Sequence, residues 1–171
     1  ALNILLKNKD KNLHIHLKKD IETAVFGDID KQKNENDINL IIKKIETFFN
    51  RKASYTIAKN DDLYGSHFVI PNLKCSNITE LKNIMKQFDV DTSVYRDGLF
   101  RLPNQTEKTK KHKHEIVVGK IQDFVYLQNN LDNIEFYKSN DTIMNKSQEQ
   151  LIADLIDIND IDNYDTWLSI I

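Results

Sequence analysis

At 171 residues the chain has the size of one domain, and its 40% of hydrophobic residues is enough to build a core. The single cysteine, Cys75, excludes an internal disulfide, and no cluster of cysteines and histidines has zinc spacing, so we expect an intracellular protein without bound zinc. No apolar run is long enough to span a membrane, and the net charge of −2 gives no general reason to bind nucleic acid. Any such binding must depend on local patches of the surface.

The first half of the chain alternates between strand and helix patterns. Strands are predicted where β-branched and aromatic residues alternate with polar ones, at residues 12–18, 21–30, 53–58 and 65–71. Helices are predicted where apolar residues recur at the helical period, at residues 37–51 and 77–88. Asp37 can cap the first of these helices, and Asn77 or Thr79 can cap the second.

Shorter elements follow in the second half. Residues 90–94 are predicted to be extended, and Asp97–Gly98 is a strong signal for a hairpin turn leading into a strand at 99–102. A further strand is predicted at 115–118 and a short helix at 119–128. This order of elements predicts an α+β fold, in which helices cover one face of an antiparallel or mixed sheet and the other face stays open.

An acidic pair ends the second predicted strand. Residues 25–30 read Val-Phe-Gly-Asp-Ile-Asp, so Asp28 and Asp30 would point to the same side of the sheet. Two adjacent carboxylates repel each other unless a cation lies between them, and Mg²⁺ or Mn²⁺ is the kind of ion that such oxygen ligands bind. The same pattern also fits a strand that runs into an acidic turn, so the pair alone does not decide.

Two further features carry candidate chemistry. His14 and His16 share one face of the first predicted strand, as would the metal-binding pair of a rolling-circle (HUH) nuclease, in which a tyrosine such as Tyr126 joins to DNA. An exposed face of a strand has the same pattern. The run 107–114 holds four lysines and two histidines in eight residues, which fits either a solvated loop or a loop that faces phosphate groups.

Three motifs occur in order along the chain. They are Val25–Asp30 with its two acids, Ser66–Ile70 with His67, and the long segment from Val90 to Leu102, which reads Val-Asp-Thr-Ser-Val-Tyr-Arg-Asp-Gly-Leu-Phe-Arg-Leu. Together they resemble the archaeo-eukaryotic primase superfamily, whose pattern is an acidic D-x-D/E strand, an S-x-H strand, and an apolar-Asp strand followed by V-Y and F-R-L. The set is most similar to the primase domain at the front of the primase-helicases of poxviruses and other large DNA viruses.

The resemblance implies an RRM-like palm, a βαββαβ-type sheet with helices on one face, followed by a short helical extension. Residues 1–128 would form the primase-polymerase domain, 129–146 a linker, and 147–171 the start of a helical region that leads to a helicase. The implied activity is the synthesis of primers on a single-stranded DNA template from ribo- or deoxyribonucleoside triphosphates. The implied cofactors are two Mg²⁺ or Mn²⁺ ions.

The resemblance also assigns roles to single residues. The catalytic acids and metal ligands would be Asp28, Asp30 and Asp91. The nucleotide-binding residues would be His67, Ser66, Arg101 and Lys108.

The chain departs from the family pattern at the second motif. Gly65 stands where the family has its serine, so that Ser66 lies in the middle of the motif, and Leu63 stands where the family often has a lysine. A third interpretation therefore stays open beside the primase and the HUH nuclease. The chain would then be a nucleic-acid-binding or assembly module that keeps the fold but lacks catalytic activity.

Overall fold

The computed structural model describes residues 13–105 and 113–139. The predicted nucleotide-binding residue Lys108, the helical region at 147–171 and residues 140–146 of the predicted linker lie outside these residues. Within them the fold is α+β with a largely antiparallel sheet, which confirms the predicted class. None of the described helices is both long enough and apolar enough to cross a membrane.

The main sheet has five strands, and a separate pair of strands lies beside it. The main strands are β2 (Thr23–Gln32), β3 (Ser54–Asn60), β4 (Leu63–Cys75), β6 (Glu115–Val118) and β7 (Glu135–Phe136). Their order is β2-β4-β3-β6, with antiparallel neighbours, and β7 pairs with β4 in parallel. The separate antiparallel pair is β1 (His14–Leu17) and β5 (Gly98–Arg101).

The helices begin at side-chain caps. Helix α2 (Glu35–Phe49) is capped by Asn34, whose side-chain oxygen accepts a hydrogen bond from the Asp37 N–H at 3.0 Å. The helix therefore begins two residues earlier than predicted, and Asp37 lies in its first turn. Helix α3 (Ile78–Met85) is capped by Asn77, one of the two predicted caps. The remaining helices are the short α4 (Ile121–Val125) and the 3₁₀ helix η1 (Thr92–Val94).

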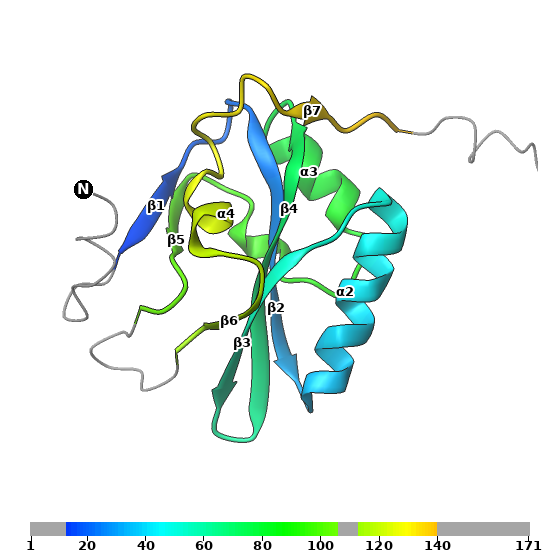
Figure 1. Cartoon of the computed structure of the whole chain (residues 1–171), viewed down its shortest axis with the longest axis vertical. Helices are drawn as coiled ribbons and strands as arrows, with labels where there is room; N and C mark the ends of the chain where they lie inside the picture. The colour runs from blue at the N-terminus through cyan, green and yellow to red at the C-terminus, as the bar shows by residue number, and fades with distance from the viewer. Residues whose placement is uncertain (1–12, 106–112, 140–171) are drawn as a thin grey trace, which may run out of the picture. The chain divides into compact units, whose positions relative to one another are not determined.

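The two faces of the main sheet are covered differently. Helices α2 and α3 lie on one side of the sheet, and the β1–β5 pair and α4 lie on the other (Figure 1). On this second side Phe100 of β5 packs edge-on against Phe26 of β2, with 5.1 Å between the ring centroids. The face that was expected to stay open is therefore open only in part.

Two predictions for the segment between α3 and β5 are wrong. Residues 90–94 do not form a strand, because Thr92–Val94 turns into η1. Asp97–Gly98 does not make a hairpin, because no strand precedes it to pair with β5, which pairs instead with the distant β1. The Asp97 carboxylate accepts a hydrogen bond from the Lys19 N–H at 2.5 Å, which joins this turn to the chain that follows β1.

The predicted linker starts inside the compact unit. Leu131 is buried, and its carbonyl accepts a hydrogen bond from the Lys74 ammonium at 2.9 Å. The same ammonium forms an ion pair with Glu22 at 2.7 Å. The compact unit extends to Tyr137, beyond the boundary predicted at residue 128. Strand β7 has only two residues, which is too short for a periodic pattern in the sequence.

Candidate metal centre

Three carboxylates meet where β2 passes the start of η1. Asp28 and Asp30 come from β2, Asp91 is the N-cap of η1, and one oxygen of each lies within 4.8 Å of the others. The backbone holds this arrangement, because the Asp91 N–H donates a hydrogen bond to the Asp28 carbonyl at 2.7 Å. Within residues 13–105 and 113–139 this is the one group of three or more acids, histidines or cysteines with metal-binding spacing.

Asp28 lacks the partners that a buried carboxylate requires. Burial raises its pKa to about 8, with further contributions from the charges of Asp30 and Asp91, while Arg101 acts in the opposite direction. The Oδ1 atom of Asp28 is buried and has no hydrogen-bond partner among the described residues. The His67 imidazole lies beside it, with 3.7 Å between His67 Nε2 and Asp28 Oδ1, beyond hydrogen-bond distance. A divalent cation would satisfy this oxygen and relieve the repulsion, so the residues fit such an ion.

Asp91 is held in its ionised form. Its carboxylate accepts hydrogen bonds from the backbone N–H and the hydroxyl of Ser93, both at 2.8 Å, and these bonds lower its pKa. The charges of Lys31 and Arg96 lower the pKa further. The cap that starts η1 thus also fixes the third carboxylate of the group, a role that the sequence motif assigns to a strand.

His67 lies next to Asp28 on the adjacent strand. The two residues are register partners in the antiparallel pair β2–β4. His67 is 5% exposed, and its ring packs against the Phe100 ring, with 4.6 Å between centroids. The β1–β5 pair therefore packs against the imidazole and helps to hold it beside the carboxylates.

Asp28, Asp30 and His67 line an open cleft of about 420 Å³. Its charged and polar lining, which we call the carboxylate cleft, includes Asp28, Asp30, Lys31, His67, Arg101 and His114. Asp30 and Lys31 also line an adjoining hollow that contains Asp91. The cleft thus brings carboxylates together with nitrogen-bearing side chains, a combination that suits a metal-bound anion.

The second motif contributes two of its three residues to this cleft. Gly65 and His67 line it, whereas Ser66 points to the opposite face of β4 and is fully buried there. A Cβ atom at position 65 would lie 3.4 Å from Asp30 Oδ1, so it is position 65 that faces the carboxylates. Ser66 therefore lies away from the site to which the resemblance assigns it.

Two residues of the cleft were not singled out from the sequence. Lys31 has a left-handed backbone (φ 57°) at the irregularity where β2 leaves its register with β4, and no sequence pattern marks such a bulge. His114 ends the lysine-rich run, so in the sequence it is read as part of a basic loop rather than as a site residue. Its only sequence signal is its position directly before strand β6.

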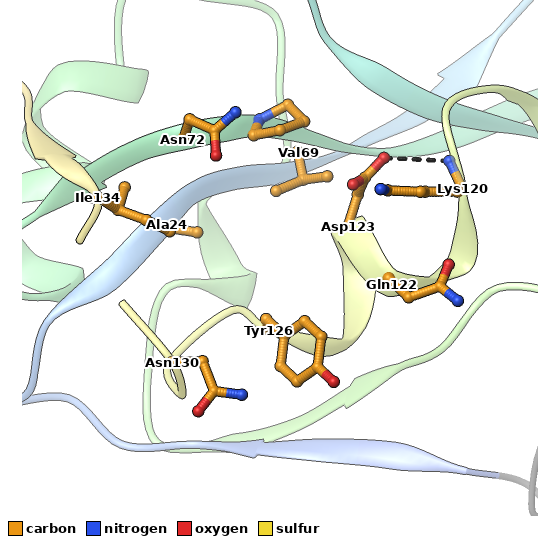
Figure 2. Close-up of a pocket in the computed structure, with 10 residues that line it drawn as sticks. Ala24, Val69, Asn72, Lys120, Gln122, Asp123, Tyr126, Asn130 and Ile134 are labelled. Atoms are coloured by element: carbon orange, nitrogen blue, oxygen red, sulfur yellow. Dashed lines mark hydrogen bonds between the residues drawn. The ribbon is translucent and has the colours of Figure 1, made fainter. Parts of the chain in front are cut away.

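The residues of the HUH interpretation are not brought together. His14 and His16 are exposed on β1, and neither belongs to a metal-binding group among the described residues. Tyr126 lines a different cavity of about 360 Å³, near Lys120 and Asp123 (Figure 2). Among the described residues no histidine lines that cavity, so none of them is placed to hold a metal beside Tyr126.

No protein-family model matches the chain, and no curated protein matches it significantly. The functional conclusion therefore depends on the geometry of the site and on the sequence motifs.

Proposed function

We propose that this chain is a template-directed nucleotidyltransferase, a primase-polymerase domain that makes primers on single-stranded DNA. One observation carries the proposal. Two carboxylates of β2 and a third from the distant residue Asp91 share one small space, and a buried imidazole lies beside them in a cleft that also contains an arginine. Carboxylates for cations beside nitrogen donors for phosphate form the arrangement that nucleotidyl transfer needs.

In this proposal Asp28, Asp30 and Asp91 hold two Mg²⁺ or Mn²⁺ ions. Bound there, the ions would supply a lowered pKa for the attacking hydroxyl and charge stabilisation for the leaving group. The 3′-hydroxyl of one nucleotide attacks the α-phosphate of the next, and pyrophosphate leaves. His67 donates a hydrogen bond to the phosphates, and Arg101 binds a phosphate group or the template strand with its planar guanidinium.

The fold and the partners follow from the resemblance. An antiparallel sheet with two helices on one face is compatible with an RRM-like palm. Single-stranded DNA is the proposed template, and ribo- or deoxyribonucleoside triphosphates are the proposed substrates. A helicase in the same polypeptide, of the kind found in the primase-helicases of large DNA viruses, is the proposed partner.

Synthesis of primers tests the proposal directly. The protein is incubated with labelled nucleotides, Mn²⁺ and a circular single-stranded DNA without a primer, beside the double variant Asp28→Ala/Asp30→Ala. We expect labelled oligonucleotides from the unaltered protein alone. Equal product from both proteins would contradict the assignment.

The same assay separates the enzyme from a silent binding module. A module that lost activity through the glycine at position 65 would still bind single-stranded DNA but would make no primers. Adding a helicase part would not restore synthesis. Binding of the DNA, followed by gel shift, is therefore measured in parallel.

A further inference from the structure

A second buried imidazole lies in the carboxylate cleft. His114 is 6% exposed, and its carbonyl accepts a hydrogen bond from the Asn104 N–H at 2.8 Å. Its ring stacks on that of His67, with 3.8 Å between centroids and 19° between planes. Both rings line the same cleft as Arg101. The resemblance assigns no role to His114, although it is nearly as buried as His67 and lines the same cleft.

Strand β3 fixes the orientation of the His114 ring. The buried hydroxyl of Thr56 lies 3.0 Å from His114 Nδ1 and accepts a hydrogen bond from the His67 N–H at 2.9 Å. One threonine thus joins both histidines. Because Thr56 contacts Nδ1, the other ring nitrogen, Nε2, is the one that can serve a ligand in the cleft.

The glycine at position 65 leaves room between the carboxylates and this ring. A Cβ atom there would lie 3.4 Å from Asp30 Oδ1 and 3.9 Å from His114 Cε1. It would also lie 3.2 Å from the Ile29 carbonyl, a tight contact with backbone. The space beside Gly65 is therefore bounded by a carboxylate on one side and by an imidazole edge on the other. A ligand that spans it must present a cation to the first and an anion to the second.

Given the proposed function, we infer that His114 binds the terminal phosphates of a nucleoside 5′-triphosphate through Nε2. The α-phosphate end of the substrate lies toward the three carboxylates, and its terminal phosphates lie against His67, His114 and Arg101. When the Thr56 hydroxyl donates to His114 Nδ1, the proton of the ring is on Nε2, which can then donate to a phosphate oxygen, and hydrogen bonds to an anion of this kind are strong. His114 compensates for the lack of a polar side chain at position 65.

Two substitutions of His114 separate contact with the ligand from support of the fold. In His114→Asn the amide lies near the position of Nδ1, so it preserves the bond to Thr56 and loses the reach of Nε2. In His114→Gln the longer side chain does the reverse. Affinities are measured by calorimetry in Mg²⁺ for the α,β-methylene analogues of ATP and dATP, which block nucleotidyl transfer, and for AMP and dAMP. Thermal melting of each variant verifies that it folds.

We expect His114→Asn to weaken binding of the triphosphate analogues by about tenfold and His114→Gln to keep it within about threefold. Binding of the monophosphates should change in neither variant. The opposite order, or affinities equal to that of the unaltered protein, would show that His114 acts only through Thr56 and would overturn the inference.

A substitution at Gly65 on β4 tests the same space without altering either histidine. Gly65→Ala should weaken binding of the triphosphate analogues at least about threefold and leave the monophosphates unaffected, because its methyl group enters the space beside Asp30. Unchanged binding would overturn the inference. If primers are made and these variants bind the analogues normally, only the role of His114 fails. If the unaltered protein binds no analogue and makes no primer, the proposed function fails with it.

Discussion

The buried carboxylate of Asp28 lowers the stability of the folded protein, and a bound cation would remove this effect. It is mostly buried, faces two other acids and has one oxygen without a hydrogen bond among the described residues. Charged groups that lower the stability of the folded protein are typical of functional sites, because a purely structural role would favour a neutral residue there. The sequence indicates the pair Asp28 and Asp30, but the burial that changes the behaviour of Asp28 depends on β5 and β4.

Substitution of Asp28 by asparagine should stabilise the metal-free protein. The native pKa of about 8 lies above the ordinary value of 3.8, so wild-type stability is lost as pH rises from about 4 to about 8, and an amide does not take part in this loss. In EDTA at pH 8 we expect Asp28→Asn to raise the melting temperature by about 4 °C or more, with a smaller difference at pH 5. A melting temperature below that of wild type at pH 8 would contradict the claim that the Asp28 carboxylate destabilises the metal-free protein.

Manganese should stabilise the protein through the acidic group. A ligand that binds only the folded state raises its stability by mass action, and 1 mM Mn²⁺ should raise the wild-type melting temperature by about 5 °C or more. We expect Asp91→Ala to abolish this shift. The matched control is Asp89→Asn, because Asp89 lies in the adjoining hollow and bonds Gln32 but is not one of the three. A shift that survives in Asp91→Ala would place the ion elsewhere.

At the scale of elements, the main strands and helices can be predicted from local patterns, whereas their pairing cannot. Strands β2, β3 and β6 and helices α2 and α3 lie close to their predicted positions because each has its own period and caps. The pairing of β1 with β5 joins residues as far as 87 positions apart (His14 with Arg101), and no local signal indicates it. That pairing covers part of the open face and shapes the cleft.

Packing between β2 and the segment after η1 should depend on Gly27. A Cβ atom there would lie 2.5 Å from the Tyr95 hydroxyl and 2.6 Å from the Phe68 ring, closer than real contacts allow. The Tyr95 hydroxyl donates a hydrogen bond to the Phe26 carbonyl at 2.8 Å, so any movement also disturbs β2. We expect Gly27→Ala to lower the free energy of unfolding by about 2 kcal/mol or more in urea titrations. The exposed Lys59→Ala serves as control, and equal midpoints for the two variants would refute the tight packing.

At the scale of the whole molecule, the cleft lies between elements from most of the described chain. Its lining comes from β2, β3, β4 and β5 and from the residue before β6. The sequence motifs identify its carboxylates, His67 and Arg101. They miss His114 and Lys31, because these residues enter the cleft through the sheet register and a strand irregularity rather than through a local pattern.

The C-terminal border of the compact unit should lie beyond residue 128. The ring of Tyr137 packs against Phe48 and Phe49 of α2, and Leu131 is buried. A chain that ends at residue 128 loses these contacts and one bond of the Lys74 ammonium. We expect it to melt about 10 °C lower than a chain that ends at residue 139, measured by circular dichroism. Equal melting temperatures would restore the predicted border.

The central claim is that the three carboxylates serve metal-dependent, template-directed synthesis. The most direct test supplies labelled ATP or dATP and, separately, labelled GTP or dGTP, with Mn²⁺, to a poly(dT) single strand. Wild-type protein and the Asp89→Asn control should incorporate adenine nucleotides, discriminate against guanine nucleotides and stop in EDTA, while Asp28→Ala/Asp30→Ala should incorporate none. Incorporation that ignores the template, or that continues in the double variant, would contradict the claim.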